Sequence, residues 1–314
     1  MAASQHYEII LNQFAGSGRV HIVWPKLQQQ LDHAQVTYQV HETQYAGHAN
    51  QLAQEIIDQQ STQIILLVIG GDGTLHEALN GVAQRPDPSV TLAYVPCGSG
   101  NDFARGAGIA LEPTTALQHL LTQPQQHTLD IGFCENLENH NWCVFSNNIG
   151  IGFDAHVVHR TNLSASKRYL NKYHLGSLAY LASLIGAFFK QRSFPIQIQT
   201  PTTKVQFKRA FLVTTTNHPY FGGGVPIMPQ ATLHDGRLDL VIVERIPTVA
   251  FIGLFALMML PGHLHTRFKA VHHYQADTLT VESTTPQFGQ ADGEDLGKRS
   301  FHFKFSVRHQ KFIF

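Results

Sequence analysis

One stretch of the sequence, Ile64 to Val82, restricts the fold more than any other. The seven residues from Ile64 to Gly70 are all apolar or glycine, which suits a strand buried on both faces. Three glycines around one carboxylate, at Gly70 to Gly73, then end the strand and allow a backbone to approach a ligand closely. Apolar residues recur beyond the turn at helical spacing, at Leu75, Ala78, Leu79 and Val82. The stretch therefore predicts a strand, a glycine turn and a helix.

The turn before this predicted helix has the features of an anion site. Thr74 and Glu77 have the spacing of a capping box, which predicts that the helix begins at Thr74. Free N–H groups and the positive end of the helix dipole would face the turn. Asp72 would repel a phosphate there unless it holds Mg²⁺ or accepts a proton from an attacking hydroxyl group. An ordinary turn in which Asp72 only caps the helix is the alternative.

Length and composition set wider limits. The 314 residues favour two domains, and 43% hydrophobic residues are typical of a globular chain. With 22 basic and 22 acidic residues the chain is near neutral. It therefore lacks the net positive charge that would attract a nucleic acid, and no nucleic-acid partner is expected. The 20 histidines do not cluster at metal-binding spacing, since the nearest approaches, His263 with His265 and His272 with His273, lack co-ligands. We interpret them as solvated or packed side chains.

Cysteines and apolar runs bear on the compartment. Cys97, Cys134 and Cys143 are odd in number and not in CxxC spacing, which fits a reducing cytoplasm. The first residues lack a basic region followed by a long apolar core, so no signal peptide is expected. The runs Leu178–Phe189 and Val249–Leu260 are too short to cross a bilayer, which needs about twenty residues. Both are expected to be packed helices, and the second also suits a membrane surface.

The first part of the chain alternates strands with helices. Such alternation predicts a parallel α/β layer with its ligand loops at the carboxyl ends of the strands. Besides the helix after Asp72, we expect helices at Val20–Ala34 and Thr43–Gln60. Strands are expected at Tyr7–Leu11, Thr37–His41, Ile64–Gly70 and Thr91–Val95.

The second part has a different character from about Leu129 onward. Short strands follow one another with Gly, Asn and Pro between them, as in antiparallel β architecture. Two predicted helices, Lys172–Lys190 and Thr248–Leu260, interrupt the strands, and the alternating tail Arg299–Phe314 is a further strand. The other expected strands are Thr128–Phe133, Trp142–Ile149, Ile196–Thr200, Lys204–Val213, Leu238–Val243 and Thr278–Glu282.

Three loops at predicted strand ends carry most of the polar chemistry. They are Asn12–Gly18, Gly70–Thr74 and Pro96–Asp102, and they would converge on one edge of a parallel sheet. Their backbone donors, hydroxyl groups and carboxylates suit a nucleoside triphosphate with Mg²⁺ better than a dinucleotide, because no GxGxxG opens a helix. Ser99 is the expected ligand contact of the third loop, whereas Asn101 and Asp102 could equally cap the next helix.

The segments GGDGTLHEALNG and PCGSGNDFARG, which begin at Gly70 and Pro96, resemble the diacylglycerol kinase catalytic-domain family of soluble bacterial lipid kinases. The resemblance covers essentially the whole chain. GGDGT alone is shared with NAD kinases and sphingosine-type kinases, whereas its combination with GSGNDFA and a later DGE is specific. The further matching segments are the loop Asn12–Gly18, Thr128–Gly132, His234–Leu238 and Ala291–Glu294.

This resemblance implies a fold in two domains. The expected fold class is α/β, with a phosphofructokinase- and NAD-kinase-like α/β nucleotide domain plus a second, β-sandwich domain. The ATP-binding domain would cover residues 1–128, with 299–314 returning to it as a last strand. The lipid-substrate domain would cover residues 129–298.

The resemblance also implies site residues. The proton acceptor matches Glu294, with Asp72 near the phosphates and Mg²⁺, and Asp130 matches an acid that helps to orient the site. A structural Mg²⁺ matches Asp235 with the backbone carbonyls of Thr232 and Arg237. The ATP contacts match Asn12, Gln13, Phe14, Ala15, Gly16, Thr43, Gly71, Asp72, Gly73, Thr74, Leu75, His76, Glu77 and Ser99.

From the residues alone, the Asp-Gly pairs at Asp235 and Asp292 are also typical of hairpin turns. If the side chains of Asp292 and Asp295 converge on Glu294, their charges would raise its pKa toward a useful range. Two departures from the family concern the first loop. Gln13 stands where the family usually has Pro, and Ser17 stands where some relatives carry Lys, so phosphate neutralisation would depend on Arg19 or Mg²⁺.

The expected function is an ATP- and Mg²⁺-dependent lipid kinase that converts diacylglycerol to phosphatidic acid, with another lipid hydroxyl or NAD as alternative acceptors. A non-catalytic protein that binds lipid or nucleotide is the remaining alternative. The expected partners are ATP and a lipid at the membrane surface, with a homodimer possible. The protein would be cytoplasmic and would contact the inner face of the membrane transiently. Tyr220–Pro229 would be a wall of the lipid cleft or a simple Gly-rich connection.

Overall fold

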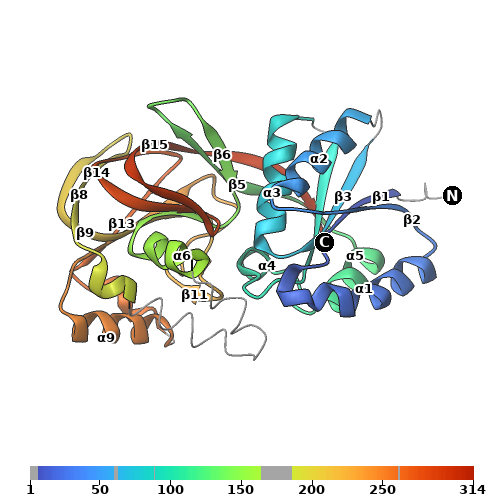
Figure 1. Ribbon diagram of the computed structural model, residues 1–314, viewed down its shortest axis with the longest axis horizontal. Coiled ribbons are helices and arrows are strands. Elements are labelled where there is room, and N and C mark those ends of the chain that lie inside the picture. The colour runs from blue at the N-terminus through green and yellow to red at the C-terminus, as the bar shows by residue number, and fades with distance from the viewer. Residues whose placement is uncertain (1–5, 60–62, 88, 164–185, 261) are drawn as a thin grey trace.

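The computed structural model describes residues 6–59, 63–87, 89–163, 186–260 and 262–314. The chain forms two lobes that lie side by side (Figure 1). The first lobe contains the N-terminal elements, and the second lobe contains most of the strands from β5 onward. The predicted helix Lys172–Lys190 lies largely outside the described residues, which resume at Gly186 with a helical segment.

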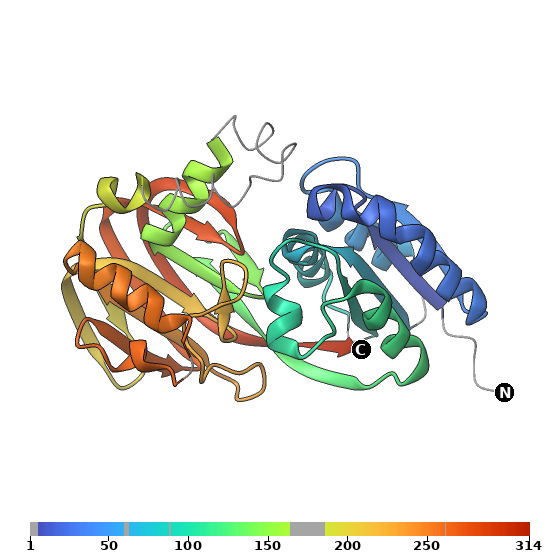
Figure 2. The same ribbon diagram turned by 90° about the horizontal axis from the view of Figure 1, so that it is seen from below.

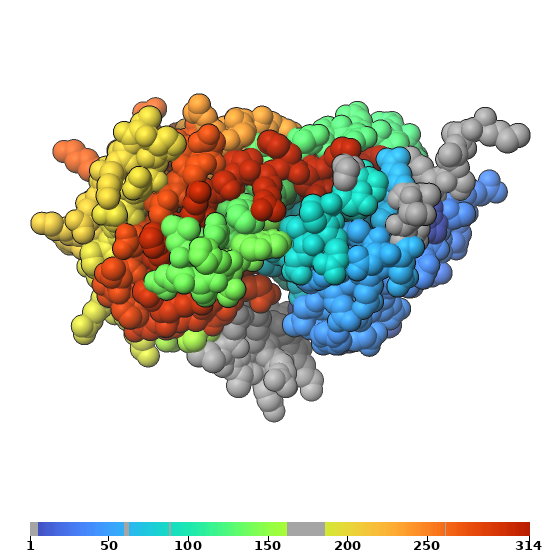
Figure 3. Space-filling view, turned by 90° about the horizontal axis from the view of Figure 1, so that it is seen from above, coloured from blue at the N-terminus to red at the C-terminus, as the bar shows by residue number. Residues whose placement is uncertain are grey.

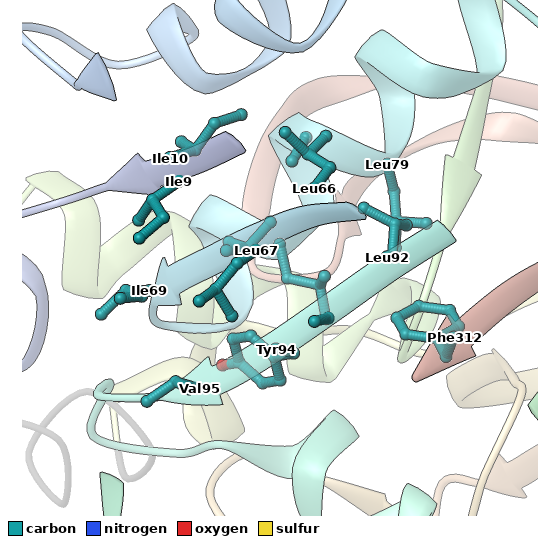
Figure 4. Close-up of a cluster of buried hydrophobic side chains, with 14 of the residues drawn as sticks. Ile9, Ile10, Leu66, Leu67, Ile69, Leu79, Leu92, Tyr94, Val95 and Phe312 are labelled. Atoms are coloured by element: carbon teal, nitrogen blue, oxygen red, sulfur yellow. The ribbon is translucent and has the colours of Figure 1, made fainter. Parts of the chain in front are cut away.

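The first lobe is built on four parallel strands in the order β2-β1-β3-β4. Every residue of β3 except Ile65 is buried, as expected for a central strand covered on both faces. Figure 4 shows how Leu66, Leu67 and Ile69 of β3 pack beside Leu92 and Tyr94 of β4. The elements are β1 His6–Leu11, α1 Ala15–His33, β2 Thr37–Glu42, α2 His48–Gln59, β3 Ile64–Gly70, α3 Asp72–Gln84, β4 Val90–Pro96, α4 Asp102–Ala107 and α5 Pro113–Thr122.

The second lobe is predominantly antiparallel. Its strands run in the order β13-β12-β9-β7-β14-β15, with β5, β6 and β8 paired beside this path. The elements are β5 Gln126–Asn136, β6 Trp142–Phe145, β7 Asn148–Gly152, α6 Phe153–Leu163, β8 Phe194–Gln199, β9 Lys204–Thr216, β10 Tyr220–Phe221, β11 Val225–Pro226, β12 Leu238–Glu244, α9 Thr248–Met258, the 3₁₀ turn η1 Leu264–Arg267, β13 Val271–Ala276, β14 Thr278–Ala291 and β15 Glu294–Ile313.

The last strand, β15, connects the lobes. It pairs with β14 and β5 in the second lobe, and Phe312 near its end pairs in parallel with Leu92 of β4. Its red atoms run from one lobe to the other in Figure 3. Phe312 is fully buried and packs into the first core (Figure 4), where such burial stabilises by about 1.5–3 kcal/mol. The exact domain limits, 1–128 with 299–314 and 129–298, stay a prediction.

Several predicted boundaries are wrong. Strands β5, β9 and β14 extend beyond their predicted ranges, and β15 begins at Glu294 rather than Arg299. Three further differences lie at helix starts or within a predicted strand. The second helix begins at His48 rather than Thr43, because Gly47 adopts a positive φ of 88° just before it. The helix after the glycine turn begins at Asp72, two residues before Thr74. The predicted strand Trp142–Ile149 is two strands, β6 and β7, separated at Ser146 and Asn147.

Candidate active site

Close contact between the loops explains their glycines. A side chain on Gly98 would place its Cβ 2.7 Å from the Cα atom of Gly71, so the second and third loops touch through their backbones. A Cβ on Gly16, which also has a φ of 59°, would lie 2.3 Å from the carbonyl oxygen of Cys97. The three loops therefore converge at the carboxyl ends of β1, β3 and β4, as the sequence predicts.

These loops line a cavity of about 490 Å³, which we name the polar cavity because hydroxyl, amide and carboxylate side chains lie in its lining. The N-terminus of α3 opens onto it, so the first N–H groups of that helix lack intrahelical partners at this point. Its walls include most of the predicted ATP contacts and also Glu294 from the second lobe. The lining residues are Asn12, Phe14, Ala15, Gly16, Thr43, Gln44, Tyr45, Ala46, Gly71, Asp72, Gly73, Thr74, Glu77, Gly98, Ser99 and Glu294.

Four predicted ATP-site residues do not line this cavity. Leu75 is fully buried in the hydrophobic core of the first lobe. The amide oxygen of Gln13 lies 3.0 Å from Nδ1 of His21. His76 and Asp130 contact residues of other elements, as the next paragraphs describe.

The predicted capping box does not form. Helix α3 has no side-chain hydrogen bond at its N-cap, and Oγ1 of Thr74 instead accepts a 2.9 Å hydrogen bond from Nδ2 of Asn12. The Glu77 carboxylate accepts hydrogen bonds from the backbone N–H groups of Gly47 at 2.8 Å and Ala49 at 3.1 Å. It therefore caps α2, a neighbouring helix, rather than its own.

Asp72 caps α4 from a different loop. Its two carboxylate oxygens each accept a 3.2 Å hydrogen bond, from the backbone N–H groups of Asp102 and Phe103. Burial and the nearby Asp102 charge raise the pKa of Asp72 to about 6. Asn101 occupies the N-cap position of α4 with a φ of 53°, but its side chain bonds to Gly98 instead. The alternative in which a side chain of Asn101 or Asp102 caps α4 is therefore wrong.

Asp102 places a second carboxylate beside that of Asp72. Its Oδ2 accepts a 2.8 Å hydrogen bond from the Gly223 N–H, and its buried Oδ1 has no partner among the described residues. Burial raises the pKa of Asp102 above its ordinary value. Two neighbouring carboxylates with one unsatisfied buried oxygen are a donor set that fits Mg²⁺, which prefers carboxylate and water oxygens.

Asp72 also lines a second, apolar cavity of about 320 Å³. Its polar end consists of Asp72, Asp102, Asp292 and their neighbours, and its walls are mainly aliphatic and aromatic. The Gly-rich hairpin of β10 and β11 forms one of these walls, and α6 and α9 contribute others. The lining includes Phe153, Asp154, Val157, Val158, Thr161, Leu212, Phe221, Gly222, Gly223, Val225, Ile227, Val243, Phe251, Leu254, Phe255 and Met258.

Asp154 is a carboxylate that the sequence analysis missed. It follows the Gly-Ile-Gly-Phe segment at the end of β7, and a carboxylate directly after an apolar strand was the available signal. One oxygen accepts a 3.1 Å hydrogen bond from Nε2 of Gln290, while the buried Oδ1 has no partner within the described ranges. Burial raises the pKa of Asp154 to about 6.

Glu294 sits directly after a tight hairpin turn. Asp292 and Gly293 have φ values of 47° and 89°, and positive values at both central residues are typical of the type I′ turn. Oε1 of Glu294 lies 3.9 Å from the position that a Cβ on Gly73 would take, so its side chain reaches the glycine turn of the first lobe. Asp292 and Gly293 therefore form a hairpin turn, and Glu294 directly after it lines the polar cavity.

The expected cluster of three carboxylates does not form. Asp295 pairs with His159, with 2.6 Å between Oδ2 and Nδ1. Asp292 is turned into the protein, where Oδ2 accepts hydrogen bonds from Nδ1 of His76 at 2.9 Å and from the N–H and hydroxyl of Ser146. Its Oδ1 accepts from the N–H groups of Asn147 and Asn148, both at 2.9 Å. These bonds take the backbone donors between β6 and β7, which explains the interruption there.

The pair of His76 and Asp292 joins the two lobes. Burial alone would lower the pKa of His76, but its hydrogen bond to Asp292 and the charge of that carboxylate raise it above the ordinary value. Burial alone would raise the pKa of Asp292, but the contacts with His76, Ser146 and Asn147 hold it below the ordinary value. The interaction therefore favours an imidazolium and a carboxylate.

Asp130 lies beside the predicted structural metal site rather than beside the polar cavity. Its Oδ2 accepts a 2.7 Å hydrogen bond from the Gly236 N–H, and its Oδ1 lies 3.0 Å from Nδ1 of His309. Asp235 accepts from the Arg237 N–H and from Nε2 of Gln275. Among the described residues, no group of three or more His, Cys, Asp or Glu side chains is arranged for a metal ion. Mg²⁺ at Asp235, Thr232 and Arg237 stays a prediction.

The comparisons with known proteins match both parts of the chain. Residues 6–134 match the model of the diacylglycerol kinase catalytic domain. Residues 147–308 match the YegS C-terminal NAD kinase beta sandwich-like domain. YtlR of Bacillus subtilis, a protein named as a lipid kinase, is 30% identical over 96% of this chain and 97% of its own length. The chain belongs to the diacylglycerol kinase catalytic-domain family. It is a diacylglycerol kinase-like lipid kinase.

Other relatives of this lipid kinase match over most of their length. The diacylglycerol kinase of Bacillus subtilis is 29% identical over 90% of this chain and 87% of that protein. A crystal structure of a diacylglycerol kinase from Bacillus anthracis superimposes with a TM-score of 0.70 at 20% identity, covering 99% of this chain and 97% of that one. This structural likeness shows the fold. Within the described parts of the lipid kinase, no helix is long and apolar enough to cross a membrane.

Proposed function

We propose that this lipid kinase transfers the γ-phosphate of ATP to the free hydroxyl of diacylglycerol and forms phosphatidic acid. One observation carries the proposal: a polar cavity and an apolar cavity meet at Asp72, which lines both. Phosphoryl transfer requires that donor and acceptor meet in line at one point, with charge stabilisation and a proton acceptor beside them. A triphosphate on one side and a lipid on the other would meet at this carboxylate.

The polar cavity suits the nucleotide. The glycine loops leave room for phosphates, and the N-terminus of α3 offers unpaired N–H groups with the positive end of its dipole. Asn12 is fixed by its bond to Thr74, so the first loop is held against the second without the Pro that the family usually carries at position 13. Gly16, Ser99 and Thr43 would line the remainder of the nucleotide.

Asp72 and Asp102 would hold the Mg²⁺ that accompanies ATP. The ion, when bound, would supply positive charge against the phosphate oxygens. The chain itself positions these two side chains through backbone N–H bonds from α4 and from the Gly223 hairpin. A Mg²⁺ at the Asp235 turn, where Asp130 also lies, is a second and purely structural proposal.

Glu294 would accept the proton of the lipid hydroxyl. It lines the polar cavity, while the preceding Gly293 lines the apolar one, so the residue stands at the junction. Asp72 is assigned to Mg²⁺ instead, because Asp102 places a second carboxylate beside it, with one oxygen unpartnered in the described part of the chain. The unpartnered oxygen of Asp154 would accept a hydrogen bond from a polar group of the lipid headgroup while the acyl chains occupy the apolar walls.

We propose further that the enzyme works in the cytoplasm and binds the inner face of the membrane transiently, as a monomer or homodimer. Another lipid hydroxyl, of a sphingoid base or phosphatidylglycerol, remains the alternative acceptor. The mainly apolar lining of the cavity beside Asp72 favours a lipid over NAD.

The direct test is phosphorylation of a lipid panel with labelled ATP, with NAD included. We expect turnover on diacylglycerol that requires Mg²⁺ and falls by about 10²–10⁴-fold in Glu294→Gln, the usual effect of losing a proton acceptor. Asp295→Asn, next in the chain but paired outside the cavity, is the matched control and should retain activity. Labelled phosphate on no lipid at all would overturn the lipid assignment, and NADP formation would replace it.

A further inference from the structure

After Thr248 at its first position, helix α9 carries no polar side chain. From Val249 to Leu260 the sequence is VAFIGLFALMML, whereas a surface helix normally has a polar face toward solvent. Leu254 and Met258 are buried, while Val249 is 84% exposed, Ile252 63% and Met259 56%. The exposed residues recur at i, i+3 and i+10, so they form one stripe along the helix. Helix α9, in orange, lies on the outside of the second lobe in Figure 2.

The inner side of the same helix forms a wall of the apolar cavity. Phe251, Leu254, Phe255 and Met258 line that cavity, and Phe255 is itself 36% exposed. A single layer of helix therefore separates the proposed acyl site from the exposed stripe. Phe255 therefore belongs both to the cavity wall and to the exposed surface.

The following turn extends the apolar surface and adds positive charge. Leu264 and Phe268 are exposed beside the end of α9, and η1 contacts α9 directly. Arg267 and Lys269 stand among them and are exposed as well. We name as the α9 patch the residues Val249, Ile252, Phe255, Met259, Leu260, Leu264 and Phe268.

We propose that the α9 patch docks on the surface of an anionic lipid bilayer. The proposal rests on the proposed function, since it supplies the route by which a membrane lipid reaches the apolar cavity. Apolar side chains would enter the boundary between headgroups and acyl chains, and Arg267 and Lys269 would contact lipid phosphates. The apolar stripe matches the acyl region of a membrane, and the basic residues at one end match its anionic headgroups. A second, neutral protein surface would match the stripe but not the positive charge.

The test is binding of the full-length protein to sedimented vesicles of phosphatidylcholine, with and without phosphatidylglycerol. The variant Ile252→Gln/Met259→Gln changes only exposed residues that do not line the cavity, and we expect at least tenfold weaker binding. The matched control is Ile22→Gln in α1 of the first lobe, because Ile22 is 75% exposed but far from α9 in sequence and lobe. Binding by Ile22→Gln should equal that of the wild type.

A charge variant tests the second part of the proposal. Arg267→Gln/Lys269→Gln should weaken binding to phosphatidylglycerol vesicles several-fold and flatten its salt dependence, while Lys26→Gln on α1 should not. Unchanged vesicle binding in the Ile252/Met259 variant would overturn the proposal. So would a wild-type dimer, seen by sedimentation velocity, that the same variant dissociates, because a second copy would then cover the α9 patch.

Turnover on a short-chain diacylglycerol dispersed as monomers separates this proposal from the function on which it rests. The α9 variant should phosphorylate the monomeric lipid at the wild-type rate and lose activity only on vesicles. Wild-type protein that binds vesicles through α9 yet phosphorylates neither form of lipid would refute the proposed function and support the docking.

Discussion

Asp292 is the carboxylate whose removal should cost the most stability. The substitution Asp292→Asn keeps the shape of the side chain but replaces one carboxylate oxygen by an NH₂ group. In the wild type five hydrogen bonds are shared between two oxygens, whereas the variant has a single oxygen acceptor. If that oxygen remains toward His76 and Ser146, the N–H groups of Asn147 and Asn148 face an amide NH₂ and lose their acceptor. Each buried donor left unsatisfied costs about 1–3 kcal/mol, and the buried charge pair with His76 is broken as well. We expect a loss of about 3–5 kcal/mol.

Urea unfolding, followed by fluorescence and circular dichroism, measures this loss. The control is Asp295→Asn in the same hairpin, because its ion pair with His159 is partly exposed and should contribute about 1 kcal/mol or less. An Asp292→Asn protein within about 1 kcal/mol of both the wild type and this control would refute the reasoning. The same result would mean that the five hydrogen bonds do not hold the turn that carries Glu294.

The pH dependence gives a second readout of the same pair. The pKa of Asp292 is lowered on folding, so its contribution is present above the ordinary value of 3.8 and is lost as pH falls through the folded value. The pKa of His76 is raised on folding, so its contribution is present below the ordinary value of 6.5 and is lost as pH rises through the folded value. The stability difference between wild type and Asp292→Asn should therefore be largest between these two ordinary values.

Three further predictions concern single side chains. Glu77→Ala removes the acceptor for Gly47 and Ala49 at the start of α2, and thermal melts should show a loss of about 1–2 kcal/mol; an unchanged melt would contradict the cap. Asp154→Asn should stabilise the protein in urea by about 1–3 kcal/mol at pH 8, because burial raises the pKa of Asp154 from 3.8 to about 6 and ionisation costs stability as pH rises through that range. This gain in stability should vanish near pH 4, where Asp154 is protonated in the folded wild type. The variant should also phosphorylate lipid more slowly. Equal stability of variant and wild type at pH 8 would refute the prediction. Gly98→Ala should impair ATP binding, measured by calorimetry, because its Cβ would meet the Gly71 backbone, whereas Gly253→Ala in α9 has open space and should bind ATP normally.

The meeting of the glycine loops in one cavity could be predicted from the sequence because the pattern that specifies them is local. A buried strand that ends in Gly-Gly-Asp-Gly specifies both the loop and the helix end beside it, and parallel strands bring such loops to one edge. The residues from Asn12 to Gly16, Gly71 to Thr74 and Ser99 accordingly meet in one cavity, except for Gln13. The unbroken apolar run likewise predicted the limits of β3 without error, since a strand buried on both faces needs no polar residue.

The errors arose where a side chain acts on a distant element. Glu77 has the spacing of a cap for α3 but caps α2, and Asp72 caps α4 although Asn101 is adjacent in sequence. Nothing in the local sequence distinguishes these partners, because capping requires only an acceptor near free N–H groups, and tertiary packing decides which helix is near. Local motifs therefore identified polar residues that share one cavity but assigned several of their hydrogen-bond partners wrongly.

The same reasoning shows why the β14–β15 hairpin belongs to the site. An Asp-Gly pair would form this turn in any antiparallel sheet, so the sequence alone cannot separate a turn from a functional group. In the folded chain the Asp292 carboxylate bonds His76 of α3 and three consecutive backbone N–H groups of the second lobe, while Glu294 reaches Gly73. The hairpin is thus fixed to the helix that begins at the glycine turn. Any movement of one lobe against the other must break the His76–Asp292 contact or move Glu294 together with α3, so the position of the proposed proton acceptor depends on contact between the two lobes.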